Sequence, residues 1–263
     1  MKTLVIKVGG AFMQAEHKAL ALLSVICQLQ QQYHVVLVHG GGPMVEELLG
    51  GLGLNSQKIK GLRVTPKEHM PYVVGALAGT ANKQLCALAI RAGLNSVGLC
   101  LADGQTTQCT VISEELGAVG TAKAGNSQLL DGILAANMLP IISSIGADKQ
   151  GHLLNVNADQ AATVIAQLLQ AELLLLSDVP GVLDAQGQLM SRLSTAEINN
   201  LINQQVISDG MLVKVQAALD AANSLNRPVT IASWQHAEQL LALLQQQTLG
   251  TTIIPQVLTK DSL

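Results

Sequence analysis

The segment TLVIKVGG, residues 3–10, carries the chain's clearest fold signal. Apolar residues fill most of it, as in a strand buried in a parallel sheet, and two glycines end it. Lys7 interrupts the apolar run just before the glycines, where a buried strand has no structural need of a charge. A similar run, HVVLVHGGG at 34–42, follows a helical pattern over 15–32. A strand, a helix and a second strand in this order predict a parallel βαβ unit.

Strand-like and helical patterns alternate along the rest of the chain. Strands are expected at 96–101, 138–147, 171–179 and 228–233, with a hairpin formed by 108–112 and 118–124. Helices are expected after Pro43 and over 66–91, 126–137, 157–170, 194–203, 211–225 and 236–247. This alternation predicts an α/β fold with a central parallel sheet covered on both faces.

Composition limits the function classes. The chain has 263 residues, of which 49% are hydrophobic and 13% charged, so one large domain or two intimate lobes can form. A net charge of -3 and 2% aromatic residues give no reason to expect nucleic acid as a partner. No run of 18 apolar residues occurs, so no membrane span is expected. The four cysteines form no CxxC pair, which favours small buried side chains in a reducing cytosol, and the histidines show no metal-ligand spacing.

The two glycine turns predict an anion site. Lys7-Val8-Gly9-Gly10 and His39-Gly40-Gly41-Gly42 both follow strand-like runs, and ligands of parallel sheets bind beyond the carboxyl ends of strands. Glycines there let main-chain N–H groups approach a phosphate closely. The alternative is a pair of tight turns, with Lys7 reaching out to solvent. Two equivalent turns with a lysine favour the anion site.

The common nucleotide signatures are missing. No GxGxxG follows a strand, which disfavours a dinucleotide-binding dehydrogenase. No GxxxxGK[ST], HRD or DFG occurs either, which excludes the P-loop and protein-kinase patterns.

A second group of polar residues lies in the later part of the chain. LLNVNADQAAT at 153–163 places Asn155, Asn157 and Asp159 at a helix start, where either Asn157 or Asp159 could cap the helix. Asp178 ends a very apolar strand, and Lys214, which alone reads as a surface lysine, lies in the first turns of a helix.

Arg63 lies between apolar residues, as a pinned bidentate group does. Two lysines, an aspartate, an arginine and glycine loops without an activated serine or cysteine are typical of phosphoryl transfer by positioning and charge stabilisation.

Seven motifs together carry a family resemblance that runs from residue 3 to about residue 254. They are KVGG, VHGGG, GLRVT, GALAGTANK, NVNADQAAT, LLSDVPGVLD and SDGMLVKVQAAL. With them the chain resembles the acetylglutamate kinases, a branch of the amino-acid kinase family. The resemblance implies an open αβα sandwich with a central, mainly parallel sheet. It also implies transfer of the γ-phosphoryl group of ATP, bound with Mg²⁺, to the side-chain carboxylate of N-acetyl-L-glutamate in arginine biosynthesis.

The resemblance also implies roles for individual residues. Lys7 and Lys214 bracket the phosphoryl group, and Asp159 holds both lysines. Gly10 and Gly41 donate main-chain N–H groups to the reacting atoms. The other expected ligands are Gly41, Gly42, Arg63 and Asn155 for the acyl amino acid, and Asp178, Val179, Pro180, Gly181, Val182, Leu183, Val206, Ile207, Ser208 and Asp209 for the nucleotide. Mg²⁺ is held by phosphate oxygens and water, with no metal ligand from the protein, and His39 is interpreted as structural.

The domain organisation and assembly follow from the same resemblance. Residues 1–180 are expected to form an acyl-amino-acid-binding lobe and residues 181–263 an ATP-binding lobe, with a soft boundary, and the tail after Ile254 has no assigned role. Arginine-inhibited relatives carry an extra helix before the first strand, whereas here the strand begins at Thr3. The expectation is therefore a cytoplasmic homodimer that is insensitive to arginine.

Two alternatives remain. One is another kinase of the same family, acting on glutamate, aspartate, carbamate or UMP. The other is a non-catalytic sensor that has kept the fold.

Overall fold

The first strand of the chain lies in the middle of the main sheet. The computed structural model describes residues 1–256, apart from the side chain of Asp209. β1 (Lys2–Val8) pairs in parallel with β2 (Tyr33–His39) on one side and with β11 (Glu172–Ser177) on the other. The central position explains the apolar sequence of β1, because both of its faces are covered.

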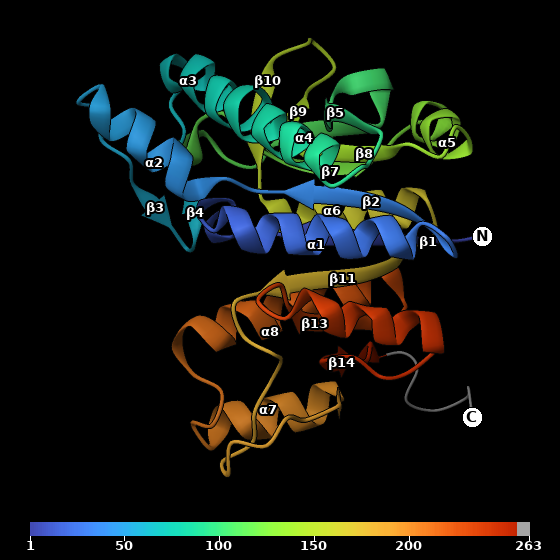
Figure 1. The fold of residues 1–263 in the computed structure, drawn as a ribbon. Coiled ribbons are helices and arrows are strands. Elements are labelled where there is room, and N and C mark those ends of the chain that lie inside the picture. Colours follow the sequence, from blue (N-terminus) through green and yellow to red (C-terminus); the bar gives the residue numbers. More distant parts are fainter. Residues whose placement is uncertain (257–263) are drawn as a thin grey trace.

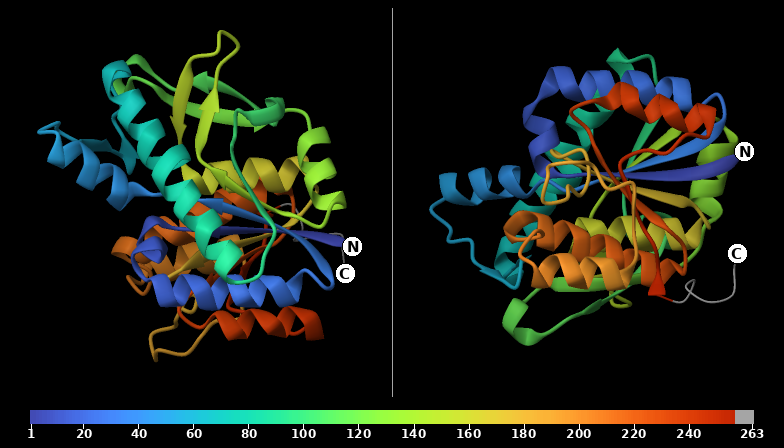
Figure 2. Two further views of the ribbon diagram at one scale, coloured as in Figure 1. Left: turned by 45° about the horizontal axis from the view of Figure 1, so that its top comes forward. Right: turned by 90° about the horizontal axis from the view of Figure 1, so that it is seen from below.

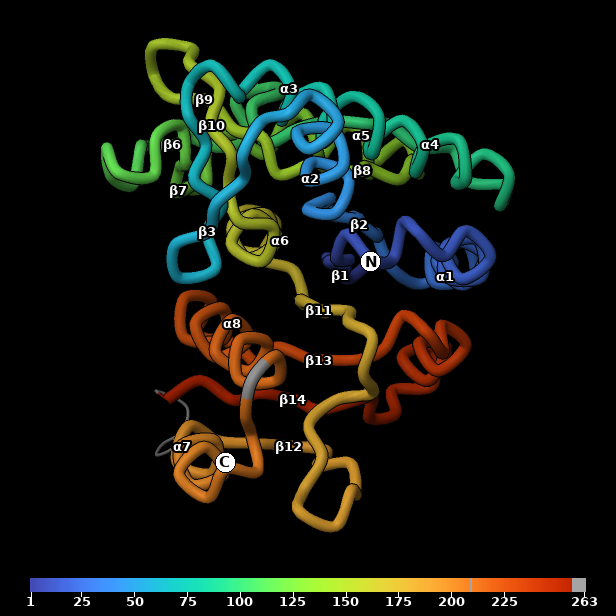
Figure 3. The backbone as a smooth tube through the Cα atoms, turned by 90° about the vertical axis from the view of Figure 1, so that its left-hand side faces the viewer, coloured from blue at the N-terminus to red at the C-terminus, as the bar shows by residue number. Residues whose placement is uncertain are grey.

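The main sheet has eight strands in the order β12-β14-β13-β11-β1-β2-β8-β5 (Figure 3). All neighbouring strands are parallel except β13 and β14, which run antiparallel. The predicted mainly parallel α/β sheet is therefore confirmed. The strands not yet bounded are β5 (Ser96–Cys100), β8 (Leu139–Ser143), β12 (Arg192–Leu193), β13 (Val229–Ser233) and β14 (Thr251–Ile253).

Helices cover both faces of this sheet. α6 (Ala158–Leu168) and α8 (Asp209–Leu225) lie on one side, and α1 (Glu16–Leu29) lies on the other with the helical segment η6 (Ala237–Gln245), as Figure 3 shows. Each face has its own hydrophobic core, and alternate residues of β1 contribute to each. Val5 belongs to the core under α6 and α8, whereas Leu4 and Ile6 belong to the core under α1.

A second, smaller sheet stands on one end of the main one, at the top of Figure 1 and in the left view of Figure 2. Its order is β6-β7-β10-β9, with β6 (Thr107–Val111) and β7 (Val119–Ala124) forming the predicted hairpin, followed by β10 (Leu153–Val156) and β9 (Ile145–Ala147). The prediction of one strand over 138–147 was wrong. The chain leaves the main sheet at Ser144, whose carbonyl accepts a hydrogen bond from Val156 N at 3.0 Å, and β9 then pairs with β10.

A long helical stretch runs from Lys67 to Arg91, close to the range predicted. It consists of η2 (Lys67–His69), α3 (Met70–Val74), the π-helical η3 (Gly75–Ala81) and α4 (Asn82–Arg91). Within residues 1–256 this stretch alone is long and apolar enough to cross a membrane, judged by length and composition. Core helices of soluble proteins pass the same test, so one such helix is weak support for a membrane span.

The remaining elements are short and mostly connect the larger ones. The helix expected near 236–247 is the 3₁₀ segment η6, and the hairpin of β3 (Lys58–Ile59) and β4 (Leu62–Arg63) was not predicted. The others are η1 (Gly10–Gln14), α2 (Gly42–Gly51), η4 (Asp103–Gln105), η5 (Glu114–Leu116), α5 (Gln128–Ala135) and α7 (Thr195–Asn203). Residues 257–263, the last part of the expected C-terminal lobe, lie outside the described residues.

Candidate active site

The two glycine turns meet at the carboxyl ends of β1 and β2. Gly40 N donates a hydrogen bond to Val8 O at 3.2 Å, which ties one turn to the other. A Cβ at Gly10 would overlap Pro43 Cδ, and a Cβ at Gly41 would lie 2.6 Å from Leu77 Cδ2. Gly10 is the tighter position, since a Cβ there would also meet the main chain of Gly41 and Gly42, and both turns lie near the start of α2, where a helix attracts anions.

His39 and Asn82 form a buried hydrogen-bonded pair next to the glycine turn 40–42. Asn82 Nδ2 lies 3.1 Å from His39 Nε2 and 2.8 Å from Ile141 O. Because an amide nitrogen can only donate, Nε2 accepts, and Nδ1 carries the ring hydrogen that it donates to Gly40 O at 2.8 Å. Burial lowers the pKa of His39 to about 4, so the ring is neutral at pH 7. This geometry supports the interpretation of His39 as a structural group.

Lys7 and Asp159 form an ion pair beside the glycine turns. Lys7 Nζ lies 2.7 Å from Asp159 Oδ1, and the side chains are 15% and 29% exposed. Asn157 caps α6, since its Oδ1 accepts hydrogen bonds from Asp159 N at 2.8 Å and Gln160 N at 3.1 Å. The question of which residue caps the helix is thereby answered. The Asp159 carboxylate does not serve as the cap and faces Lys7 instead.

Lys214 pairs with Asp178 instead of Asp159. Its Nζ lies 2.5 Å from Asp178 Oδ1, and the hydrogen bond from Lys214 holds the pKa of that carboxyl below its usual value. Asp159 thus faces Lys7 in this structure, and its contact with Lys214 stays a prediction for the protein with its substrates bound. α8 brings Lys214 to the carboxyl end of β11, where Asp178 lies, while Asp159 faces the neighbouring strand β1.

A cleft of about 290 Å³ brings these two ion pairs together. Trp234 forms part of its wall and packs against Phe12 edge to face, with ring centroids 5.9 Å apart. The cleft therefore combines two cations and two carboxylates with a main-chain turn. Its remaining lining residues are Gly9, Gly10, Ala11, Leu175, Leu176, Ser177, Val213, Ala217 and Ile231.

A second cleft, of about 210 Å³, lies on the other side of the glycine turn after β2. It contains all four residues predicted to bind the acyl amino acid. These are Gly41, Gly42, Arg63 and Asn155. The two clefts are adjacent, because Ala158 lines one and Asp159 lines the other. A molecule in each cleft would therefore meet the other near Lys7 and the glycine turns.

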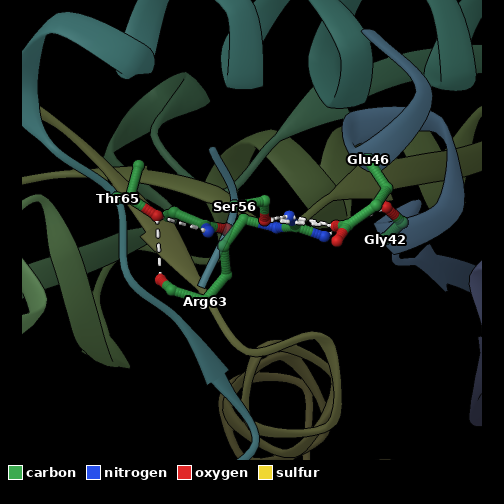
Figure 4. Close-up of polar contacts among 6 residues, drawn as sticks. Gly42, Glu46, Ser56, Arg63 and Thr65 are labelled. Atoms are coloured by element: carbon green, nitrogen blue, oxygen red, sulfur yellow. Dashed lines mark hydrogen bonds and ion pairs between the residues drawn. The ribbon is translucent and has the colours of Figure 1, made fainter. Parts of the chain in front are cut away.

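Arg63 is held from several sides, as Figure 4 shows. Its guanidinium contacts Glu46 and Ser56 through Nη1, and Nη2 donates to Gly42 O at 3.1 Å. Thr65 Oγ1 donates to the Arg63 carbonyl at 2.9 Å and accepts from Asn155 Nδ2 at 3.1 Å. Arg63 and Asn155 are thus fixed relative to each other through one threonine hydroxyl.

The residues predicted to bind the nucleotide divide into two groups. Asp178 lines the cleft near Lys7, and Val179 to Leu183 form the chain that leaves β11. Val182 and Ile207 are core residues, with 0% and 2% exposure, and the main chain of Val182 is hydrogen-bonded inside the protein, through its N–H to Thr251 Oγ1 and through its carbonyl to Met190 N. Ser208 directly precedes the first turn of α8, and Val206 lies two residues before it in the sequence. The side chain of Asp209 lies outside the described part of the structure.

Several residues of this region were missed by the sequence reasoning. Glu46, Ser56 and Thr65 contact predicted site residues but belong to no chemical pattern, although Thr65 lies within GLRVT. Asn82, within GALAGTANK, contacts the structural His39. Gln235 was also missed, and its Nε2 donates to the Asp178 carbonyl at 3.1 Å. Over residues 1–256, no group of three or more His, Cys, Asp and Glu side chains is arranged to hold a metal ion.

Comparison with known proteins places the chain in a family. The profile of the amino acid kinase family matches residues 2–233. An acetylglutamate kinase from Aeromonas salmonicida is 52% identical over 254 residues, which cover 96% of this chain and 98% of that one. The structure of smu.665 from Streptococcus mutans covers 96% of this chain and 98% of its own, with a TM-score of 0.77 and 28% identity. A carbamate kinase from Giardia lamblia bound to AMP-PNP has a TM-score of 0.66 at 19% identity, covering 97% of this chain and 99% of its own, and so shares the fold. The chain belongs to the amino acid kinase family and, within it, to the acetylglutamate kinases.

Proposed function

We propose that this chain transfers the γ-phosphoryl group of ATP to the side-chain carboxylate of N-acetyl-L-glutamate. The product is N-acetyl-L-glutamyl 5-phosphate, which belongs to arginine biosynthesis. The observation that carries the proposal is the pair of adjacent clefts, one containing Arg63 and Asn155 and the other containing Lys7 and Lys214. The 52% identity with the Aeromonas salmonicida kinase supports the same substrate.

The acyl amino acid is assigned to the cleft with Arg63. The guanidinium fork matches a carboxylate, and Asn155 is fixed beside it by Thr65, within reach of the α-carboxylate or the acetamide end. Gly41 and Gly42 contribute main-chain N–H groups, since both line this cleft and carry no side chain of their own. Because the side-chain carboxylate is already ionised at neutral pH, the reaction needs no general base.

The nucleotide is assigned to the cleft with Lys7 and Lys214. One oxygen of the substrate carboxylate forms a bond to the γ-phosphorus, the bond to the β–γ bridging oxygen breaks, and ADP leaves with that electron pair. Lys7, Lys214 and the N–H groups of Gly10 and Gly41 stabilise the charge that spreads over the phosphoryl oxygens. Asp159 orients Lys7, and Asp178 holds Lys214 until phosphate oxygens compete for it.

Mg²⁺ fits this site as a companion of the nucleotide. Both carboxylates of the cleft already face a lysine, at 2.7 and 2.5 Å, so the donor set favours a cation held by phosphate oxygens and water. The chemistry that Mg²⁺ supplies is neutralisation of phosphate charge.

The same proposal includes two lobes, a homodimer and a cytoplasmic location. Residues 1–180 bind the acyl amino acid and residues 181–263 the nucleotide. β5 is an edge strand of the main sheet, and Ile90 on the adjacent α4 is 69% exposed, which supports a partner at this edge. The cysteines of residues 1–256 are unpaired, as is usual in a reducing compartment.

Trapping the product with hydroxylamine tests the proposed reaction. The protein is incubated with MgATP, hydroxylamine and one acceptor per tube, chosen from N-acetyl-L-glutamate, glutamate, aspartate, carbamate and UMP. Hydroxamate with N-acetyl-L-glutamate alone, matched by ADP release, is the expected result. ADP release with another acceptor instead would assign the chain to a different substrate of the amino-acid kinase family. Nucleotide binding without ADP release in any tube would favour the alternative function, a non-catalytic sensor that has kept the fold.

A further inference from the structure

We propose that Glu46 is a positioning residue, which orients the Arg63 guanidinium so that one edge of it is presented to the substrate carboxylate. The proposal rests on the proposed function, because it takes a carboxylate of the acyl amino acid as the partner of Arg63. Glu46 does not line the substrate cleft and acts through Arg63. It lies on α2, the helix that starts from the glycine turn.

Three acceptors hold the guanidinium. Nη1 contacts the Glu46 carboxylate and donates to Ser56 Oγ, and Ser56 Oγ in turn donates to Glu46 Oε2 at 3.2 Å. Nη2 donates to Gly42 O at 3.1 Å. Figure 4 shows Glu46, Ser56 and Gly42 gathered at the outer end of the Arg63 side chain. The contacts join Arg63 on β4 and Ser56, just before β3, to Gly42 and Glu46 on α2.

These contacts leave a defined set of donors. A guanidinium has five N–H groups; here Nη1 faces the Glu46 carboxylate and donates to Ser56 Oγ, and Nη2 donates to Gly42 O. Within residues 1–256, Nε–H has no acceptor, and Nη2 makes one hydrogen bond, to Gly42 O, so Nε–H and one N–H of Nη2 remain for a ligand. Two parallel N–H groups on one edge match the two oxygens of a carboxylate. Glu46 therefore contacts the Nη1 side of the guanidinium, and the Nε side remains open to the substrate carboxylate.

Burial gives the two partners different functions. The Arg63 side chain is 8% exposed, whereas that of Glu46 is 49% exposed. Partial burial acts to raise the pKa of the Glu46 carboxyl, but the Arg63 guanidinium outweighs it and holds that pKa below its usual value. Glu46 is thus a half-exposed carboxylate that neutralises the buried Arg63 cation and fixes the orientation of its guanidinium before substrate binds.

A competing role is a carboxylate that occupies Arg63 in place of the substrate. The geometry disfavours this role, because Glu46 contacts Nη1, whereas Nε–H has no acceptor within residues 1–256. The two roles predict opposite changes in substrate affinity. If Glu46 orients Arg63, removing it raises the KM for the acyl amino acid. If Glu46 competes with the substrate for Arg63, removing it lowers that KM.

Steady-state kinetics of four proteins test the proposal. They are the unchanged protein, Glu46→Ala, Glu46→Gln and Glu47→Ala, assayed as hydroxamate formation with either N-acetyl-L-glutamate or ATP varied. Glu47 is the adjacent exposed residue of the same helix and serves as the matched control. Glu46→Ala is expected to raise the KM for N-acetyl-L-glutamate by roughly 10-fold, as for loss of a hydrogen bond to a charged group, with the KM for ATP unchanged. Glu46→Gln keeps an acceptor and should show a smaller increase.

A double-mutant cycle with Arg63→Ala shows whether Glu46 acts through Arg63. In the Arg63→Ala background, Glu46→Ala is expected to leave kcat/KM for N-acetyl-L-glutamate almost unchanged. The same loss in both backgrounds, an equal increase in both KM values, or a lower KM for N-acetyl-L-glutamate would overturn the positioning role. These outcomes all require hydroxamate from the unchanged protein. Absence of hydroxamate there would overturn the proposed function, and the Glu46 assignment with it.

Discussion

Lys7 Nζ lies 2.7 Å from Asp159 Oδ1, at the point where the carboxyl end of β1 faces the first turn of α6. This pair answers why a buried strand carries a lysine. The strand holds the ammonium group rigidly in the cleft that also contains Lys214, and the carboxylate compensates its charge. Since the side chains are only 15% and 29% exposed, the pair is better shielded from water than a surface ion pair.

Replacing Asp159 tests the orienting role of this carboxylate. Asp159→Asn is expected to lower kcat by roughly 10-fold or more, because Lys7 loses the partly buried carboxylate that it pairs with. Asp131→Asn, at an exposed position on α5, should leave kcat unchanged. The measurement is kcat for hydroxamate formation, and equal kcat values for the two variants would remove Asp159 from the catalytic group.

Arg63→Lys tests bidentate recognition of the acyl amino acid. A lysine keeps the positive charge but loses the planar fork, so the KM for N-acetyl-L-glutamate is expected to increase while the KM for ATP stays the same. Arg91→Lys is the control, because Arg91 lies in an exposed ion pair with Glu16 at 2.5 Å. An unchanged KM for the acyl amino acid in Arg63→Lys would exclude Arg63 from the substrate cleft.

Asn157→Ala tests whether the cap of α6 supports catalysis as well as stability. The variant loses the cap of α6, which should lower the free energy of unfolding by about 1 kcal/mol. It should also lower kcat, because the first turn of α6 carries Asp159. Ser194→Ala removes the cap of α7, away from both clefts, and should destabilise the protein without changing kcat. Denaturant unfolding and kcat are measured for both, and a normal kcat in Asn157→Ala would contradict the coupling.

His39 predicts a pH dependence of stability. Its pKa in the folded protein is lowered to about 4, whereas the unfolded chain binds a proton near pH 6.5. As pH falls from 7 to 5, the unfolded state takes up this proton and the folded state does not, so about 2 kcal/mol of stability is lost. His39→Gln should reduce this loss, and His17→Gln, at an exposed position, should not. Unfolding free energies at pH 7 and pH 5 measure it, and identical losses in both variants would contradict a buried neutral His39.

The sequence was most informative where one strand determines both fold and chemistry. The apolar runs of β1, β2 and β11 predicted the centre of the sheet, because a parallel strand is buried on both faces. Parallel strands also align their carboxyl ends, so the meeting of the two glycine turns could be predicted from their positions after the strands. The position of Asp178 at a strand end followed from the same reasoning, whereas the place of Asp159 beside Lys7 was implied only by the family resemblance.

Contacts set by tertiary geometry could not be predicted in this way. Nothing in the helical pattern around Glu46 distinguishes it from Glu47, and only the fold brings it to Arg63. The pairing of Lys214 with Asp178 depends on where α8 meets β11. The break at Ser144 lies inside a continuous apolar run, and it arises because a second sheet competes for that part of the chain.

Turnover of Lys7→Ala measures the central claim most directly, with Lys2→Ala as the matched control. Both lysines lie on β1, but Lys2 pairs with Glu172 at the exposed beginning of the strand, at 2.9 Å. The account predicts that Lys7→Ala lowers kcat for hydroxamate formation by roughly 10²–10³-fold, as for removal of one preorganised charge-stabilising donor, while Lys2→Ala keeps the kcat of the unchanged protein. Nearly equal kcat values for the two variants would contradict phosphoryl transfer at the Lys7–Asp159 pair.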